Sequence, residues 1–503
     1  MKSRTGKALR NTVFQLLLEL VTAGCGLILP RLILSHFGST YNGITQSISQ
    51  FISCIALLKS GIGSVTRASL YKPLAEQNSY AISEVVNATE RFMRRIAAIF
   101  CIFVLVFGAI YPFIIDESLS WGFVFSLVII LSISTVAQYF FGLTYQMLIE
   151  ADQNNYIISI VSIVSTLVNT LIAAVLIELG YSIHVVKLGS AIVFVVPPIF
   201  YMLFARRKYG VDKTVPANEK LISQRWDAFA HQLANFINNN TDIMVTTIFL
   251  GVKEVSVYAV YNMIVNNMQK VVNSFSSGTT AAFGNMIAKK ELNTLKERFN
   301  QFEAAMYGIC ALLFTTTVSL YIPFIKIYTR GISDVNYSRQ SLASFFCLAA
   351  FFSCIKLVYE NAIFAAGYFK KTKVGAYSEA IINIVTSVFL VREIGLSGIL
   401  IGTIVGGLFR TAYNNYIASR YVLSRNPIRL VYAMIYTICC SVITWEMSHF
   451  LPYYRINGYL DWGLMAVYTF ILNIIICVGL GFLFFYTDYK ALIVQIKAKF
   501  LRT

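Results

Sequence analysis

The chain has 503 residues, of which 57% are hydrophobic and only 13% are charged, and its formal net charge is +17. Soluble globular domains carry about 25% charged residues, so this composition excludes an ordinary soluble protein and indicates an integral membrane protein. The positive charge does not indicate nucleic-acid binding, because Lys and Arg are concentrated on alternate segments between apolar windows, as the positive-inside rule requires.

Apolar windows of roughly 20 residues, long enough to cross about 30 Å of hydrocarbon, recur from one end of the chain to the other. The segments predicted to lie in the cytoplasm hold about 29 Lys and Arg, and the opposite loops hold about seven, which places both termini inside. The nine cysteines all fall within apolar windows, and their spacing does not indicate a metal site. We therefore predict an all-α protein with about fourteen transmembrane helices, near residues 12–34, 44–66, 95–115, 121–147, 156–178, 184–204, 226–250, 255–280, 301–327, 340–366, 374–391, 396–419, 428–450 and 463–486.

Four pairs of segments resemble each other at a common separation of 213 to 215 residues. One pair is SHFGSTYNGITQSISQF and IFLGVKEVSVYAVYNMI, which aligns Gly38 with Gly251. This separation predicts two pseudo-symmetric six-helix lobes, at 1–212 and 213–425, followed by an extra helix pair and a cytoplasmic tail at 426–503. Because six is even, both lobes enter the membrane from the same side, as in transporters built from parallel repeats.

The predicted seventh helix carries a polar stripe. Its members are spaced by three or four residues, which places them on one helical face: Asp227, His231, Asn235, Asn238 and Asp242. Shorter stripes occur in the first helix (Gln15, Glu19, Thr22) and in the eighth (Asn266, Lys270, Asn273, Ser277). An ionisable group that faces lipid costs at least about 2.5–3.5 kcal/mol, so these faces meet other helices or water. We predict a water-filled cavity between the lobes; the alternative is hydrogen bonding between packed helices.

Cationic residues inside the predicted spans suit an anionic ligand. We predict that a diphosphate headgroup is bound by Arg31, Lys59, Arg67 and Lys270, with Asn235 and Asn238 contacting sugar hydroxyls. For Arg31 and Arg67 the alternative is that each side chain reaches the membrane surface. Lys356 and Glu360 are spaced for an ordinary ion pair along one helix. The candidates for coupling to H⁺ or Na⁺ are Asp242, His231, Glu360 and Asp227, although membrane potential alone is an alternative driving force; no catalytic residue, metal or cofactor is expected.

Several stretches resemble the polysaccharide-biosynthesis branch of the multidrug/oligosaccharidyl-lipid/polysaccharide flippase superfamily, which exports O-antigen, teichoic-acid and capsule repeat units. They are SGIGSVTRASLYKPLAEQN, NTDIMVTTIFLGVKEVSVYAVYNMI, AAFGNMIAKKE and IINIVTSVFLVREIGLSGILIGTIVG. The resemblance implies two V-shaped lobes, alternating access, and transport of an undecaprenyl-diphosphate oligosaccharide across the bacterial cytoplasmic membrane, from the inner to the outer leaflet. Asp242 matches the acid of the family's TD motif. Lys59 stands where the family is expected to have an acid, which favours direct contact with an anion there.

Three alternatives remain open at this point. Two are transporters of the same superfamily: a cation-coupled multidrug exporter and a peptidoglycan-precursor flippase. The third is a membrane polysaccharide polymerase or glycosyltransferase, but the sequence contains no DxD, HExxH, GxSxG or P-loop motif, so we predict that the protein is not an enzyme. The expected partners are the polyprenyl-diphosphate oligosaccharide, membrane lipids, and a polysaccharide polymerase with its glycosyltransferases; nucleic acid is not one.

Overall fold

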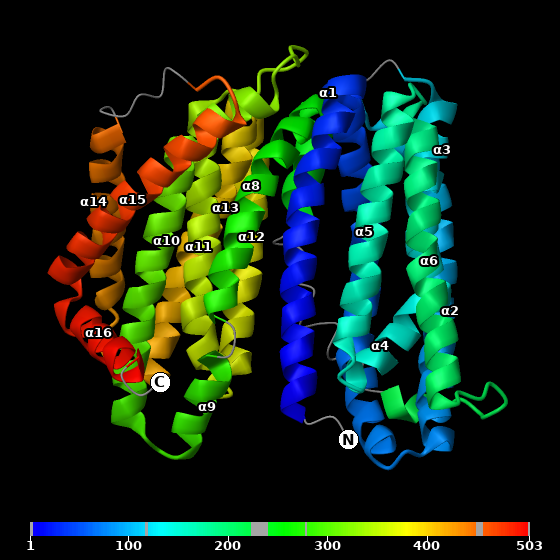
Figure 1. Ribbon diagram of the computed structural model, residues 1–503, viewed down its shortest axis with the longest axis horizontal. Helices are drawn as coiled ribbons and strands as arrows, with labels where there is room; N and C mark the ends of the chain where they lie inside the picture. The colour runs from blue at the N-terminus through cyan, green and yellow to red at the C-terminus, as the bar shows by residue number, and fades with distance from the viewer. Residues whose placement is uncertain (1–3, 116–118, 223–239, 277–278, 449–455, 501–503) are drawn as a thin grey trace. The chain divides into compact units, whose positions relative to one another are not determined.

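The computed structural model describes residues 4–115, 119–222, 240–276, 279–448 and 456–500. Within these ranges every regular element is a helix, which confirms the predicted fold class of an all-helical membrane protein. The chain divides into two compact units, residues 1–257 and 258–503. In each unit the long helices run side by side, roughly antiparallel to their neighbours in sequence (Figure 1).

Among its described residues, the first unit holds the long helices of the first repeat and the start of α8. The elements are α1 (Arg4–Ala75), α2 (Ser79–Ile110), η1 (Tyr111–Phe113), α3 (Trp121–Ala137), η2 (Gln138–Gly142), α4 (Leu143–Ala151), α5 (Asn155–Glu178), α6 (Ile183–Tyr209) and η3 (Glu219–Ile222). Residues 240–250 are also helical. The short π-helix η2 joins α3 to α4 without a loop, so this predicted span continues past its expected end at 147 to Ala151.

The second unit contains most of α8 (Val252–Ser276), α9 (Thr279–Ala288), and a bundle of long helices. These are α10 (Leu292–Tyr328), α11 (Gln340–Ala365), α12 (Phe369–Ile394), α13 (Leu396–Ile417), η4 (Ala418–Val422), α14 (Arg429–Ser448), α15 (Tyr459–Phe484) and α16 (Tyr486–Phe500). The helix α16 lies in the segment that the sequence predicted as a cytoplasmic tail.

Eleven segments among the described residues are long and apolar enough to span a membrane, against about fourteen predicted. The difference has identifiable causes. The predicted spans 12–34 and 44–66 both lie in α1, where Gly38 has φ 82° and ψ −179° and interrupts the helical conformation. Most of the predicted span 226–250 lies outside the described residues. The predicted span 255–280 corresponds to α8, whose many polar side chains lower its mean hydropathy below that of a candidate membrane span.

The internal repeat is also visible in backbone conformation. Five pairs of residues with left-handed φ angles are separated by 213 to 215 positions: Gly38 and Gly251, Gln77 and Lys290, Gln153 and Gly367, Gly180 and Gly395, and Gly210 and Ser424. Such angles are uncommon outside glycine, and they mark the turns between helices. Five turns or kinks of the first half, among the described residues, therefore recur in the second half with the separation seen in the sequence.

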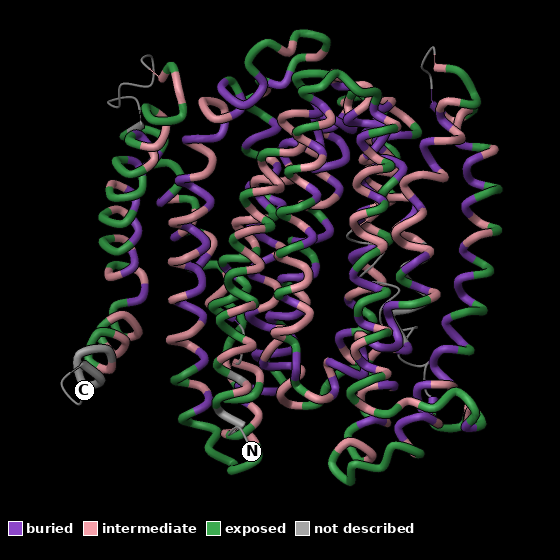
Figure 2. The backbone as a smooth tube through the Cα atoms, turned by 45° about the vertical axis from the view of Figure 1, so that its right-hand side comes forward, coloured by how far each residue is buried: buried purple, intermediate pink, exposed green. Residues whose placement is uncertain are grey.

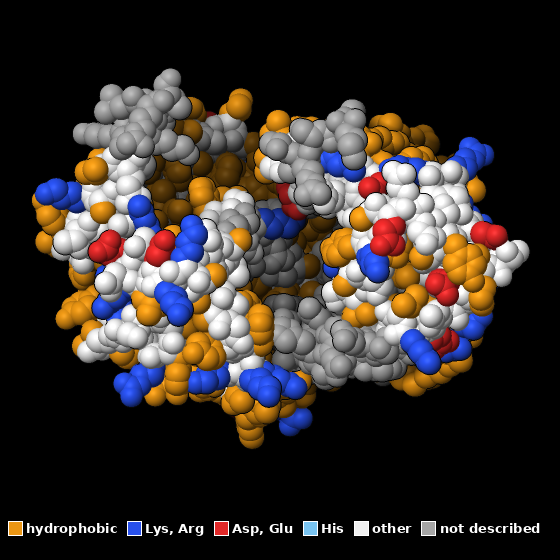
Figure 3. Space-filling model, turned by 90° about the horizontal axis from the view of Figure 1, so that it is seen from below, with side chains coloured by type: hydrophobic (Ala, Val, Ile, Leu, Met, Phe, Trp, Pro, Cys, Tyr) orange, Lys and Arg blue, Asp and Glu red, His pale blue; other side chains and the backbone are white. Residues whose placement is uncertain are grey.

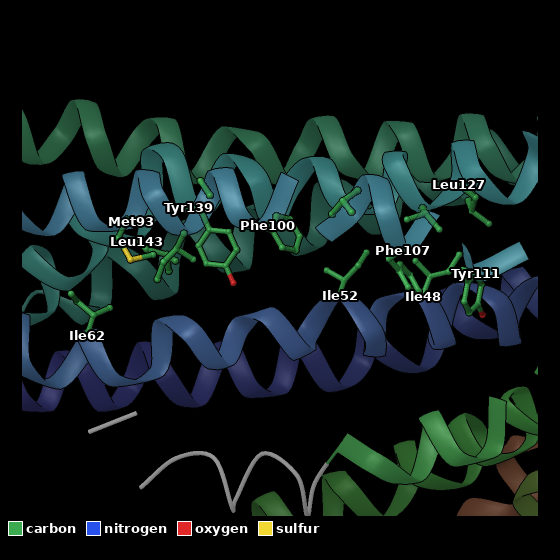
Figure 4. Packing of buried hydrophobic residues seen from close by; sticks show 14 of the residues in the cluster. Ile48, Ile52, Ile62, Met93, Phe100, Phe107, Tyr111, Leu127, Tyr139 and Leu143 are labelled. Carbon is green, nitrogen blue, oxygen red and sulfur yellow. The ribbon is translucent and has the colours of Figure 1, made fainter. Parts of the chain in front are cut away.

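Each unit has its own core of buried apolar side chains. Figure 4 shows Ile52, Phe100 and Phe107 in a row between α1 and α2 in the first unit, with Tyr139 of the π-helix η2 beside Phe100. In the second unit, the fully buried large side chains include Tyr261, Tyr307, Tyr321, Tyr359, Phe299 and Phe346. Figure 2 shows that buried positions follow one side of many helices while exposed positions follow the other.

The exposed sides of the outer helices are apolar, as lipid contact requires. On α5 the exposed side chains recur every three or four residues: Ile160, Val164, Leu167, Val168, Leu171 and Val175. An apolar stripe of this kind would be unfavourable in water, and it is the surface that the hydrocarbon of a bilayer solvates. The exposed stripe supports the prediction that the protein is embedded in a membrane.

One glycine permits a close helix crossing in the first unit. A Cβ atom on Gly43 would lie 1.7 Å from the carbonyl oxygen of Val252, which no larger residue tolerates. Beside this contact, Asn42 Nδ2 donates a hydrogen bond of 2.7 Å to Ser256 Oγ. The second half of α1 is thereby fixed to the first turns of α8, next to the pair of left-handed glycines.

Polar groups are concentrated at the ends of the helices. Figure 3 shows Lys and Arg side chains on the face of each unit that is seen from below. In the first unit Asp152, between α4 and α5, accepts hydrogen bonds of 2.8 Å from Lys208 Nζ and from Tyr209 Oη. Lys7 Nζ lies 3.5 Å from the same carboxylate, so Asp152 connects α1, the α4–α5 turn and α6.

The Asp152→Asn variant is expected to lose about 1 kcal/mol of stability at neutral pH. Burial by itself raises the pKa of the Asp152 carboxyl, but hydrogen bonds from Lys208 and Tyr209 outweigh it and hold the pKa below the ordinary value of an aspartate. A carboxyl with a lowered pKa stabilises the folded state above its ordinary pKa, and this contribution is lost as the pH falls through the folded-state value. The unfolding temperature in detergent should therefore be lower for Asp152→Asn than for the wild type at pH 7, and this difference in unfolding temperature should become smaller below about pH 4. A constant gap across that range would contradict the ionic role of Asp152.

Candidate functional site

Three consecutive helices of the second unit bring four charged side chains together inside the bundle. Lys356 and Glu360 lie one turn apart on α11, Glu379 lies on α12, and Arg410 lies on α13. Their side chains are only 14%, 13%, 6% and 4% exposed, respectively. We refer to these four residues as the α11–α13 charge cluster.

Glycines let the helices approach closely enough to form this cluster. On α12, a Cβ atom at Gly375 would lie 2.5 Å from Nη1 of Arg410. On α13, Cβ atoms at Gly398 and Gly402 would lie within 3 Å of backbone atoms of α12. Small residues at these positions allow two membrane helices to pack backbone to backbone. The glycine-rich run of the family-like stretch is therefore a packing surface that brings Arg410 against α12.

The hydrogen bonds of the cluster pass between helices. Arg410 donates to Glu360 Oε1 from Nη2 at 2.8 Å and from Nε at 3.1 Å, and Asn414 Nδ2 adds a third bond of 3.1 Å to the same oxygen. Lys356 Nζ donates a bond of 2.7 Å to Glu379 Oε1. The other Glu379 oxygen lies 3.9 Å from Arg410 Nε, so the two ion pairs form one network.

This arrangement differs from the pair expected along α11. Lys356 and Glu360 have the spacing of an ion pair within one helix, but each pairs with a different helix instead. Two features favour the interhelical partners. Arg410 donates two hydrogen bonds to Glu360, and Lys356 meets Glu379 in a buried site, where ion pairs are poorly screened. Glu379 was not predicted as a site residue; its signal in the sequence was one acid within the long apolar run that follows Gly375.

Two cations and two carboxylates make the cluster electrically neutral as a whole. Neutrality allows it to be buried, because an unpaired charge in a membrane interior would be costly. A proton that binds either carboxylate would leave a cation without its partner and weaken the contacts between α11, α12 and α13.

Arg67 lies in a second ion pair. Its Nη1 atom donates a hydrogen bond of 2.8 Å to Glu150 Oε2 on α4, and Gln146 Nε2 donates to the other oxygen at 3.0 Å. Arg67 is therefore neither isolated in the membrane nor free for an anion: a ligand phosphate would have to compete with Glu150. This partner was not identified from the sequence, because the two residues are 83 positions apart.

The other predicted site residues that the structure describes are divided between the two units, with Arg31 and Asp242 in the first and Lys270 in the second. Arg31 is half-buried in α1, Asp242 is 8% exposed in the helical segment 240–250, and Lys270 is exposed on α8. The side chains of Asn266 and Asn273 are exposed with Lys270 on α8, as expected for a wet helical face. The Lys59 side chain, Ser277, and the stripe residues Asp227, His231, Asn235 and Asn238 lie outside the described residues.

An apolar cavity of about 360 Å³ lies between α10, α11 and α14 in the second unit. Most of its lining is hydrocarbon, including Phe314, Leu348, Phe351 and Trp445, with hydroxyl groups such as Thr437 and Ser441 at α14. A cavity of this character suits a flexible lipid chain rather than a sugar, since it offers few hydrogen-bonding groups.

No protein-family model and no curated protein matches the sequence. Solved structures do match by shape. The lipid II flippase MurJ, in an inward closed conformation, matches at a TM-score of 0.71 with 13% identity, over 96% of this chain and 99% of that one. An inward-facing multidrug resistance MATE family transporter of the MOP superfamily matches at 0.61 with 13% identity, over 81% and 98%. A mutant of the Vibrio cholerae MATE transporter VcmN matches at 0.56 with 15% identity, over 84% and 97%. The chain therefore has the fold of these transporters.

Proposed function

We propose that this protein is a lipid-linked oligosaccharide flippase, which moves undecaprenyl-diphosphate-linked polysaccharide repeat units from the inner to the outer leaflet by alternating access. The observation that carries the proposal is the extent of the structural match. Nearly the whole chain, 96%, superimposes on a lipid II flippase, whereas the multidrug transporters account for 81% and 84%. A chain that matches a lipid flippase over nearly its whole length is better suited to a lipid-linked cargo than to a soluble drug.

The residue types in the membrane agree with such a cargo. In the proposed mechanism, Arg31, Lys59, Arg67 and Lys270 attract the diphosphate, and Asn235 and Asn238 contact the sugars. The lobes 1–212 and 213–425 move during the cycle, and the pair of helices in 426–503 serves the lipid tail. The cavity between α10, α11 and α14 supports this last role, because α14 belongs to that pair and the lining is mostly apolar.

For coupling, Glu360 is the strongest of the proposed residues. It accepts three hydrogen bonds from Arg410 and Asn414 in a neutral, buried network, so its protonation would disturb the packing of three helices. Asp242 is a second candidate because it is a buried acid in the segment that resembles the family's TD motif. His231 and Asp227 remain candidates from the sequence. The coupling ion in this proposal is H⁺ or Na⁺.

Transport of a peptidoglycan precursor is the second candidate function. It is favoured by the structural match to a lipid II flippase, which extends over 99% of that protein's chain. Both cargoes present a diphosphate on a polyprenyl chain, so the same cations would serve either. The two functions differ in the sugar, and the identity of the lipid that accumulates without the protein separates them. The proposed location is the bacterial cytoplasmic membrane with both termini inside, next to a polysaccharide polymerase and its glycosyltransferases.

The function is tested by deleting the protein in its host cell and identifying the lipid that accumulates. The proposal predicts that surface polysaccharide disappears and that undecaprenyl-diphosphate repeat units collect in the inner leaflet, as measured by lipid extraction and mass spectrometry. Accumulation of lipid II instead would assign the peptidoglycan function. Normal polysaccharide with altered drug resistance would overturn both proposals in favour of a multidrug exporter, and unpolymerised repeat units at the outer surface would indicate a polymerase.

Complementation with the Lys59→Ala or Asp242→Asn variant is expected to leave surface polysaccharide at background level while the protein remains in the membrane. Lys59 is the proposed diphosphate contact, and Asp242 is a buried acid whose charge would be lost. Lys72→Ala is the matched control, since the Lys72 side chain is 83% exposed at the end of α1. Wild-type polysaccharide levels in both variants would remove these residues from the mechanism.

A further inference from the structure

The helices α2 and α10 occupy equivalent positions in the two repeats. Each begins after a residue with left-handed φ, Gln77 or Lys290, and the residues that precede the first turns are 213 positions apart. Each carries a buried glutamate at the start of its fourth turn, Glu90 on α2 and Glu303 on α10. A constant separation of 213 residues therefore aligns α2 with α10, and corresponding positions of the two helices can be compared one by one.

On α10, the face that follows Glu303 is covered by the chain itself. Ala304 and Tyr307 are 0% exposed, and Ala311 is 1% exposed. A Cβ atom on Gly308 would lie 2.4 Å from Tyr489 Oη of α16. α10 also packs against α14 and α15. Tyr307 packs against α11, where its hydroxyl lies 3.3 Å from Tyr359 Oη, and Gly308 lets α16 approach. The chain's own helices, the C-terminal ones included, thus cover this face.

On α2, the corresponding positions are occupied by different residue types. Arg91, Arg94, Arg95 and Ala98 stand where α10 has Ala304, Tyr307, Gly308 and Ala311, and all four are exposed. They line a hollow of about 490 Å³, together with Asn87, Glu90 and residues of the 213–217 segment that include Lys213. We name this hollow, lined by the three arginines and Lys213, the α2 basic hollow.

The walls of the α2 basic hollow are held in place by hydrogen bonds. Asn87 Nδ2 donates to the carbonyl oxygens of Asp212 and Val215 at 2.9 and 2.8 Å, which fixes the segment opposite α2. Glu90 accepts from Arg94 Nη2 at 2.7 Å and lies 3.5 Å from Lys213 Nζ. Both cations are therefore held at the edge of the hollow by a single buried carboxylate.

The charge of the hollow is not balanced by its own acids. Arg95 lies 3.2 Å from Glu219, and Glu90 is shared by Arg94, Lys213 and, at 4.0 Å, Arg206. Among the described residues, Arg91 takes part in no ion pair. Four cations thus face two carboxylates, and the excess positive charge lies on a preformed surface that favours a phosphate group.

Beyond the arginines, the same helix presents an apolar surface. Further along α2 the exposed side chains are Ile99, Ile102, Leu105, Val106 and Ile110, which are 52% to 63% exposed. A basic hollow at one end of an exposed apolar stripe has the layout of a phospholipid, with its headgroup at the cations and its acyl chains along the helix.

We propose that the α2 basic hollow binds the phosphate headgroup of an anionic phospholipid, with the acyl chains on the exposed face of α2. The lipid would occupy, in the first repeat, the position that the C-terminal helices occupy in the second. A protein helix is disfavoured there because three exposed arginines replace the small and aromatic residues with which α10 meets its neighbours. The site is separate from the residues assigned to transport, and the inference does not depend on the transported sugar.

The test uses the full-length protein in a neutral detergent and measures binding of cardiolipin, phosphatidylglycerol and phosphatidylcholine by native mass spectrometry and by the shift in unfolding temperature. The Arg91→Gln/Arg95→Gln double variant is expected to bind the anionic lipids roughly ten- to thirtyfold more weakly, since each surface cation contributes about 1 kcal/mol. The Lys72→Gln/Arg207→Gln control removes two exposed cations near the ends of α1 and α6 of the same unit, and should bind as the wild type does. Arg91→Lys/Arg95→Lys keeps the charge and should retain most of the binding.

Four outcomes decide between the lipid and other ligands. Loss of anionic-lipid binding in Arg91→Gln/Arg95→Gln, with binding kept in Arg91→Lys/Arg95→Lys, supports the proposal. This holds even if the lipid-free variants differ from the wild type in stability. Equal binding by the double variant and the control overturns it. Inorganic phosphate at millimolar concentration that reproduces the shift and displaces cardiolipin would assign the hollow to a soluble phosphate compound instead. Copurification of a second protein or a second copy, abolished by the double variant, would assign the face to a protein partner and overturn the lipid assignment.

Discussion

The Arg410→Met variant is expected to lose about 3–5 kcal/mol of unfolding free energy, because removal of the guanidinium leaves buried carboxylates without their cation. Arg410 is 4% exposed, and it donates two hydrogen bonds to Glu360 Oε1. Its Nη1 atom also donates to the carbonyl oxygen of Thr372, so the substitution loosens α12 as well as α11. Unfolding in mixed detergent–SDS micelles, followed by tryptophan fluorescence, measures the loss.

Two further variants distinguish a charge effect from loss of packing. Arg410→Met/Glu360→Gln removes the opposed charge at the same time, so the double variant should lose clearly less than the sum of its two single variants. Arg420→Met is the matched control, because Arg420 is exposed in η4, at the end of the same helical run, and surface changes usually stay within about 0.5 kcal/mol. Additive losses in the double variant would show that the α11–α13 charge cluster is not energetically coupled.

The second large effect is expected for Glu303→Gln, also about 3–5 kcal/mol, since it leaves two arginines facing a neutral amide. Glu303 is 0% exposed. Arg425 donates to both of its oxygens at 2.7 and 2.8 Å, and Arg429 Nε lies 2.7 Å from one of them. Arg429 also contacts Asp488 on α16, so the network joins α10, α14 and α16. Its loss should release the C-terminal helices, which limited proteolysis of α16 would detect beside the lowered unfolding temperature.

The repeat supplies a matched control for this prediction. Glu90→Gln alters the equivalent acid of α2, whose cationic partners Arg94, Arg206 and Lys213 are 54%, 28% and 47% exposed. These cations are partly hydrated and lose less when the carboxylate is neutralised, so we expect a loss of about 1 kcal/mol. Equal losses at Glu90 and Glu303 would contradict the argument that burial of the cations, rather than burial of the acid, decides the cost.

Elements with strong apolar periodicity were predictable, and those interrupted by a local conformation were not. The windows near 156–178 and 340–366 correspond closely to α5 and α11, because a long apolar run in a membrane has no alternative to a helix. The predicted spans 12–34 and 44–66 were separated in the sequence by polar residues around Gly38. In the structure the chain continues through this region with one left-handed glycine rather than a loop.

The candidate site was predictable only in part. Glu360 and Arg410 stood out as charges in apolar helices, but the sequence paired Glu360 with Lys356, its neighbour along α11. Local spacing identifies residues that are able to meet, whereas the partner in a buried network is set by which helices pack together. The predicted contacts of Arg67 with a phosphate similarly took no account of Glu150, which lies on a helix that packs against α1.

The sequence by itself determined the membrane location, the approximate helices and the internal repeat, because hydrophobicity, charge asymmetry and a constant separation are properties of the linear chain. Only the tertiary structure decided which charges neutralise each other, which face of each repeat is covered, and where hollows remain. The physical reason is that ion pairing and burial depend on distances between helices far apart in sequence. Two equivalent helices, α2 and α10, consequently carry the same buried acid, yet one presents arginines on an exposed face and the other is covered by the end of its own chain.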